Sequence, residues 1–107
     1  MILPDRLQPG LRLVLCGTAA GRVSALRGHY YAGPGNLFWP LLAETGLTPR
    51  RLRPEENHLL PGFGIGLTDL CKTAFGSDAQ IPPAAWDHAA LFTKMNACQP
   101  ACLAFTS

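Results

Sequence analysis

The sequence predicts an α/β fold in which helices are layered on a largely parallel sheet, and two observations support this prediction. Apolar segments of strand length lie at residues 11–16, 65–70 and 101–105, and a turn containing proline or glycine precedes each of them. Helical patterns separate these segments. Strands that alternate with helices usually lie parallel in one sheet, because each helix carries the chain back across a face of that sheet.

The first half of the chain supplies one strand and one helix. Residues 11–16 are apolar at nearly every position, which is typical of a strand buried on both faces. We expect a helix over about residues 36–45, where apolar residues recur at i,i+4 spacing and Gly46 provides a stop. Pro40 removes a backbone donor near the first turn, so we expect an irregular start. Pro54 indicates a further short helical turn.

The second half repeats the pattern. Residues 65–70 form the second predicted strand, and Pro82 and Pro83 introduce a predicted helix that continues to residue 97. Residues 101–105 form the third strand, and only two residues follow it. No helix covers that strand, so we expect residues 1–107 to be a single domain whose C-terminal part is missing.

Composition limits the function classes. A chain of 107 residues with 48% hydrophobic residues is a single globular domain and is not a disordered tail. The net charge of +2 permits a local basic patch but does not by itself indicate nucleic-acid binding. Because the sequence shows neither a signal peptide nor a membrane-spanning run, we expect a cytoplasmic protein without membrane contact. The four cysteines lack zinc-site spacing, so we expect reduced thiols and no metal site.

Two loops rich in small residues indicate a ligand cleft. The first, residues 17–21, follows the first strand, and the second carries Tyr30 and Tyr31 between Gly28 and Gly33. Ligands of parallel sheets bind at the carboxyl ends of the strands, where backbone N–H groups can approach them closely. Two adjacent aromatic residues cannot both point inward. We therefore expect one of the tyrosines to offer a flat face to a planar heterocycle.

Both nucleotide-binding motifs that these glycines suggest are incomplete. No Gly-Lys-Ser/Thr follows residues 17–21, so this loop is not a Walker A motif. The glycines at 62, 64 and 66 precede a predicted strand and do not open a helix, which excludes the dinucleotide-binding fingerprint. An α/β nucleotide-binding module is therefore disfavoured.

A few charged residues are candidates for chemistry. Asp69 lies near the carboxyl end of the second strand, where it either caps the following turn or acts as a functional acid. His29, beside the tyrosines, is either a solvated loop residue or a catalyst. Arg50, Arg51 and Arg53 form a cationic cluster that is either a solvated face or a contact for phosphates.

The chain resembles the bacterial mismatch-specific uracil-DNA glycosylases, relatives of thymine-DNA glycosylase in the uracil-DNA glycosylase superfamily. The resemblance is collinear over most of the chain, and its most specific part is Asn36-Leu-Phe-Trp39 after a glycine-rich loop. It implies a three-layer sandwich that removes uracil or a related damaged or mismatched base from DNA. The base must be flipped out of the duplex for this reaction. It also implies a monomer that needs no metal or cofactor and works near the bacterial nucleoid.

The resemblance also assigns roles to individual residues. In the family's first motif the third residue is an asparagine that positions the attacking water, but here it is Ala19, followed by Ala20 in place of proline. A methyl group cannot orient water, so Asp69 is the candidate substitute. The remaining implied base-binding residues are Thr18 and Tyr31 through their backbone groups, the Tyr31 ring through stacking, and Asn36, which equally suits a helix cap.

Because of its charge, the cluster of Arg50, Arg51 and Arg53 is the candidate contact to the DNA backbone. The family's second motif, a Pro-Ser-type loop near the C-terminus, is not present in the 107 residues. The alternative to a glycosylase is therefore a catalytically impaired remnant that only binds DNA or abasic sites.

Overall fold

A parallel three-stranded sheet forms the centre of the computed structural model, which describes residues 1–106. The strands are β1 (Leu13–Gly17), β2 (Ile65–Asp69) and β3 (Cys102–Phe105), in the order β2-β1-β3. β1 pairs with both neighbours in parallel, and its last residue, Gly17, lies beside Asp69. The predicted α/β class is confirmed, with strand ends within two residues of expectation.

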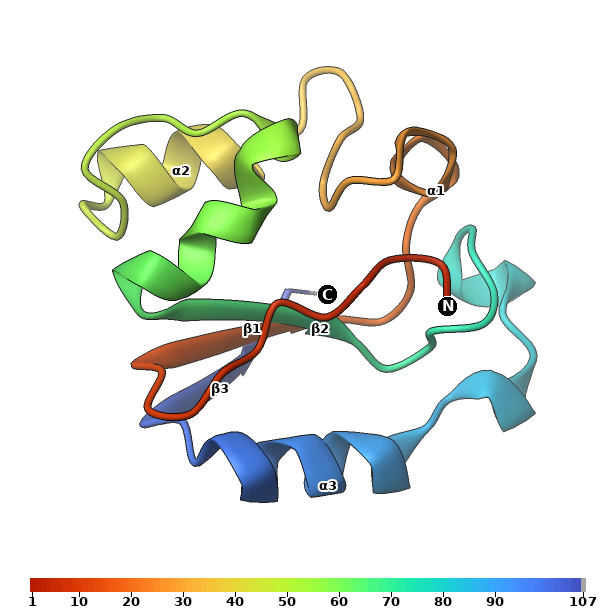
Figure 1. Cartoon of the computed structure of the whole chain (residues 1–107). Coiled ribbons are helices and arrows are strands. Elements are labelled where there is room, and N and C mark those ends of the chain that lie inside the picture. The colour runs from red at the N-terminus through yellow and green to blue at the C-terminus, as the bar shows by residue number, and fades with distance from the viewer. Residues whose placement is uncertain (107) are drawn as a thin grey trace.

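Helices cover both faces of this sheet (Figure 1). On one side lie α1 (Arg22–Arg27), α2 (Phe38–Glu44) and the 3₁₀ helix η1 (Pro54–Phe63). On the other side lies α3 (His88–Cys98), which the short 3₁₀ turns η2 (Asp78–Gln80) and η3 (Pro83–Ala85) precede. The result is the expected three-layer arrangement. No helix within residues 1–106 is long and apolar enough to cross a membrane.

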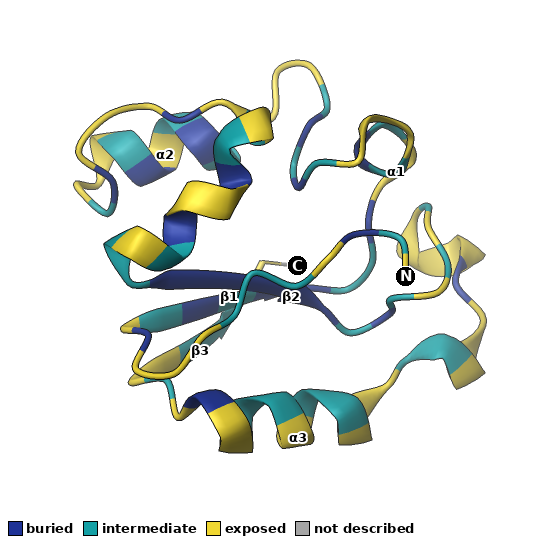
Figure 2. Ribbon diagram, in the orientation of Figure 1, coloured by how far each residue is buried: buried dark blue, intermediate teal, exposed yellow. Residues whose placement is uncertain are grey.

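The core lies mainly between β2 and the layer of α2 and η1. Every residue of β2 is buried, and Leu60 of η1 and Trp39 of α2 pack in the same cluster. Burial of such side chains is the main source of stability in a domain of this size. β3 is only half-buried at the sheet edge, as Figure 2 shows by its mixed colouring. The strands that carry the candidate residues are therefore the best anchored.

Three local features differ from the sequence-based expectation. The helix predicted to start at Pro82 is interrupted, because Asp87 accepts a hydrogen bond from the backbone N–H of Ala90 (2.9 Å) and starts α3 afresh. The helix predicted over 36–45 is confirmed but two residues shorter at its start. Helix α1 was not predicted: its six residues begin at Arg22, after the N-cap Gly21, which has no capping side chain, and they are followed by Gly28 in the left-handed conformation.

Candidate active site

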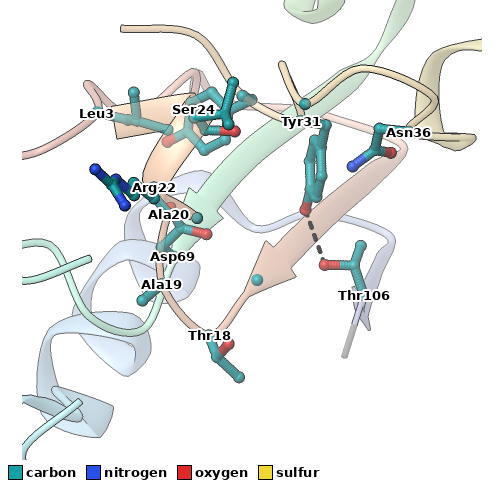
Figure 3. Close-up of a pocket in the computed structure, with 15 residues that line it drawn as sticks. Leu3, Thr18, Ala19, Ala20, Arg22, Ser24, Tyr31, Asn36, Asp69 and Thr106 are labelled. Atoms are coloured by element: carbon teal, nitrogen blue, oxygen red, sulfur yellow. Dashed lines mark hydrogen bonds between the residues drawn. The ribbon is translucent and has the colours of Figure 1, made fainter. Parts of the chain in front are cut away.

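A cavity of about 390 Å³ opens at the carboxyl ends of β1 and β2. The loop of residues 17–21 forms one wall and Tyr31 forms another (Figure 3), and Tyr30 also lines the cavity. The other residues that line it are Leu3, Arg22, Val23, Ser24, Gly33, Asn36, Asp69 and Thr106. All five residues predicted to be catalytic or base-binding line this cavity: Thr18, Ala19, Tyr31, Asn36 and Asp69.

Asp69 is placed in the cavity by strand pairing. It is the last residue of β2 and lies directly opposite Gly17, the last residue of β1. A Cβ atom on Gly17 would lie only 2.5 Å from Oδ1 of Asp69. The carboxylate therefore rests against the glycine backbone, and a larger residue at position 17 would displace it.

The environment of the carboxylate disfavours its ionised form. Burial raises the pKa of Asp69 to about 6, and the negative charge of Asp5 adds to this effect, whereas the positive charges of Lys72 and Lys94 oppose it. Within residues 1–106 no side chain donates a hydrogen bond to this carboxylate. Near neutral pH the group is thus a carboxylate with unused acceptor capacity facing a cavity, which is the state that a general base requires.

The two lysines are held by a different acid. The Asp5 carboxylate forms ion pairs with Nζ of Lys72 (2.9 Å) and Nζ of Lys94 (2.8 Å). It also accepts a hydrogen bond from the hydroxyl of Thr68 (2.7 Å). Although burial raises the pKa of Asp5, these hydrogen bonds bring it below its usual value. Lys72 consequently acts on Asp69 only through its charge. This cluster joins the N-terminal segment to β2 and α3, a long-range arrangement with no signal in the sequence.

The adjacent tyrosines take opposite roles, as expected. Tyr30 is buried, its hydroxyl donates to the carbonyl of Pro4 at 3.0 Å, and burial strongly raises its pKa. Tyr31 is only partly buried. Phe38 stacks on its ring with centroids 3.8 Å apart, the Tyr30 ring lies tilted at 6.2 Å, and Tyr31 also lines the cavity.

Tyr31 is held in a demanding conformation. Its φ of 52° lies in the left-handed region, which is unfavourable for a bulky residue, and residues strained in this way cluster at active and ligand-binding sites. The dashed line in Figure 3 marks the hydrogen bond of 2.8 Å between its hydroxyl and Oγ1 of Thr106, just beyond β3. The loop is also fixed by a hydrogen bond from the N–H of Ala32 to Oγ of Ser24 (3.1 Å). Contacts from α1, α2 and the end of β3 therefore fix the Tyr31 loop and ring, and the sequence analysis assigned no role to Ser24 or Thr106.

The loop of residues 17–21 is also fixed in place. The carbonyls of Gly17 and Thr18 accept hydrogen bonds from the N–H groups of Leu70 and Cys71. The Thr18 hydroxyl donates to Asp78 at 2.7 Å, and Figure 3 shows its side chain apart from Tyr31. Ala19 contributes a methyl group to the wall. The loop is thus held by hydrogen bonds on both sides, and Asp69 is the carboxylate among the described residues that line the cavity.

Asn36 combines the two alternatives that the sequence left open. Its Oδ1 accepts a hydrogen bond from the N–H of Phe38 at 2.9 Å, which caps the first turn of α2. Figure 3 shows its amide nitrogen on the side nearer to Tyr31, at the mouth of the cavity. One side chain can therefore cap the helix and donate to a ligand.

The structure separates the three predicted DNA-contacting arginines. Arg50 forms a two-pronged ion pair with Glu56 (2.8 and 3.2 Å), and this hydrogen bonding lowers the pKa of Glu56 to about 2. Arg51 and Arg53 instead line a second cavity of about 310 Å³, which also borders Tyr31. His29 lines neither cavity, and its Nδ1 lies 3.4 Å from Nδ2 of the buried Asn57.

The cysteines occupy two kinds of surroundings. Cys16, Cys71 and Cys98 are buried and Cys102 is exposed, and all four are free thiols. Burial raises the pKa of Cys16 to about 11, so this thiol is a poor nucleophile at neutral pH. In the part of the chain that the structure describes, no three His, Cys, Asp or Glu side chains gather closely enough to hold a metal ion.

Comparison with known protein families shows to which family this chain belongs. The family model described as the Uracil DNA glycosylase superfamily matches residues 4–106, which is nearly the whole chain. The chain belongs to this superfamily. Its α/β fold agrees with the assignment, and membership supports a DNA glycosylase with DNA as its partner. The cavity at the ends of β1 and β2 is accordingly the candidate active site of a uracil-DNA glycosylase superfamily member.

Proposed function

We propose that this protein hydrolyses the N-glycosidic bond of uracil, or a related mismatched base, flipped out of DNA, and that Asp69 is its catalytic residue. The observation that carries the proposal is the position of the Asp69 carboxylate against Gly17 inside the 390 Å³ cavity. Superfamily membership over residues 4–106 supports the reaction class. The resemblance to the mismatch-specific branch supports uracil as the base and a monomer as the active form.

The chemistry requires a water and a place for its proton. As the bond between the sugar C1′ and the base nitrogen breaks, the base departs as an anion and the sugar becomes cation-like. The water oxygen then bonds to C1′, and the ionised Asp69 carboxylate accepts the water proton. The negative charge of the same carboxylate stabilises the cation-like sugar. Solvent protonates the departed base and takes the proton from Asp69, which restores the carboxylate and balances the reaction.

The other cavity residues bind the extruded base. The Tyr31 ring stacks on the uracil ring, the backbone groups of Thr18 and Tyr31 contact its polar edge, and the Asn36 amide donates to a carbonyl oxygen of the base. The Ala19 methyl leaves room for the water that an asparagine positions in related enzymes. In this arrangement Asp69 replaces that asparagine in function, from the neighbouring strand.

An excision assay tests the proposal. The protein is incubated with a labelled duplex that contains one uracil opposite guanine, and abasic sites are then cleaved with alkali. We expect a single product at the uracil position and none from a matched duplex with cytosine there. Absence of product from the uracil duplex, with gel retardation retained, would contradict the proposal and identify a DNA-binding protein without glycosylase activity.

A further inference from the structure

The second cavity adjoins the active-site cavity. Its volume is about 310 Å³, and three residues line both spaces: Tyr31, Gly33 and Asn36. A ligand that extends from the first cavity past Tyr31 therefore enters the second without crossing a covered surface. Gly33 adds no side chain to the shared lining.

The second cavity is positively charged. Arg27, Arg51 and Arg53 line it, and Glu55 is the acidic residue among the described residues that do so. Arg27 comes from the last turn of α1, and the other two come from the segment before η1. Sequence reasoning did not find Arg27, because it lies 24 residues from Arg51 and has no charged neighbour in sequence.

Two of these guanidinium groups have unused donors. Arg27 makes only a long hydrogen bond of 3.4 Å to the carbonyl of Ala32, and Arg51 forms no ion pair within residues 1–106. Arg53 lies 3.5 Å from a Glu56 oxygen. A planar guanidinium with several N–H donors matches the oxygens of a phosphate better than any other side chain does.

We propose that the second cavity binds the phosphodiester that adjoins the extruded nucleotide, with Arg27 and Arg51 as its principal contacts. This inference rests on one part of the proposed function, namely that a DNA nucleotide occupies the first cavity. In a nucleotide a single sugar separates the base from its phosphate. With the base in the first cavity, the phosphate would lie on the other side of Tyr31, in the second cavity. The pairing of Arg50 with Glu56 excludes that arginine from the contact.

The salt dependence of DNA binding tests the number of phosphate contacts. The probe is a duplex with one hydrolysis-resistant 2′-fluorinated deoxyuridine, and its affinity is measured from 50 to 300 mM salt. Each lost phosphate contact reduces the slope of log affinity against log salt by about 0.9 in duplex DNA. We expect Arg27→Gln and Arg51→Gln each to reduce the slope by about this amount.

Arg12→Gln is the matched control, because it removes the same charge at the amino end of β1, where Arg12 donates to the carbonyl of Phe63 at 2.6 Å. We expect it to leave the slope unchanged. Circular dichroism confirms that each variant is folded. An equal loss of slope in Arg12→Gln and in the two cavity variants would contradict a defined phosphate site and indicate a general effect of charge.

Neutral methylphosphonate linkages locate the contact. Replacing a phosphodiester next to the uracil should weaken binding by the wild-type protein about tenfold and should have little further effect in the Arg27→Gln/Arg51→Gln double variant. A penalty that persists in the double variant would overturn the proposal. Uracil release is measured separately on unmodified DNA. Arginine-dependent binding without uracil release would support the phosphate site and contradict the proposed glycosylase reaction.

Discussion

Replacing Asp69 with asparagine should stabilise the protein while it removes the catalytic carboxylate. The pKa of Asp69 is raised from 3.8 to about 6 by burial. A raised pKa means that the ionised group destabilises the fold, by about 3 kcal/mol at pH 8 for a difference of this size. This cost is absent below pH 3.8, where the group is protonated in both states, and it grows as the pH rises toward 6.

The assay is urea unfolding of both proteins at pH 8 and pH 4. We expect Asp69→Asn to have the higher free energy of unfolding at pH 8, and we expect this advantage to shrink by about 2 kcal/mol at pH 4. Glu44→Gln is the control, since Glu44 is exposed and should give no such pH-dependent gain. An advantage that stays constant between the two pH values would refute the claim that Asp69 is a buried, charged group.

Three further results are expected of the same site. Since the base must be ionised, kcat/KM for uracil excision should fall about tenfold per pH unit below pH 6 and level off above it, as a pH–rate profile would show. Gly17→Ala should lower the excision rate about 100-fold in single-turnover assays, because its Cβ would displace the Asp69 carboxylate. Tyr31→Leu should weaken binding to uracil-containing DNA by about 1–3 kcal/mol in titrations, whereas Tyr31→Phe, which keeps the ring, should not. A flat pH profile, a fully active Gly17→Ala variant or equal binding by both Tyr31 variants would each count against the assigned role.

Local patterns predicted the strands and the main cavity residues. The apolar segments at 11–16 and 65–70 and the two glycine-rich loops after the first of them are local signals, so the sequence placed Asp69 at a strand end and Tyr31 in a loop of the same cleft. The contact between Gly17 and Asp69 could not be predicted, because it depends on the register in which β1 pairs with β2. The pairing of Gly17 with Asp69 joins residues 52 positions apart, and only the assembled sheet shows that glycine is needed there.

The other features that the sequence analysis missed also depend on tertiary packing. Helix α1 has no capping side chain and only six residues, so it depends on packing and not on a sequence signal. The contact of Thr106 with Tyr31 and the convergence of Arg27 with Arg51 both join distant segments. The sequence grouped Arg50 with Arg51 because they are adjacent, but the chain turns one toward Glu56 and the other toward the second cavity.

Single-turnover excision at pH 8, with the protein in excess over a uracil-containing duplex, measures the contribution of Asp69 directly. Affinity for the fluorinated duplex is determined in parallel for the wild type and for Asp69→Asn. If this oxygen takes the water proton, the variant should release uracil at least about 100-fold more slowly while it binds the DNA equally well. Equal rates in the two proteins would show that another group performs the hydrolysis.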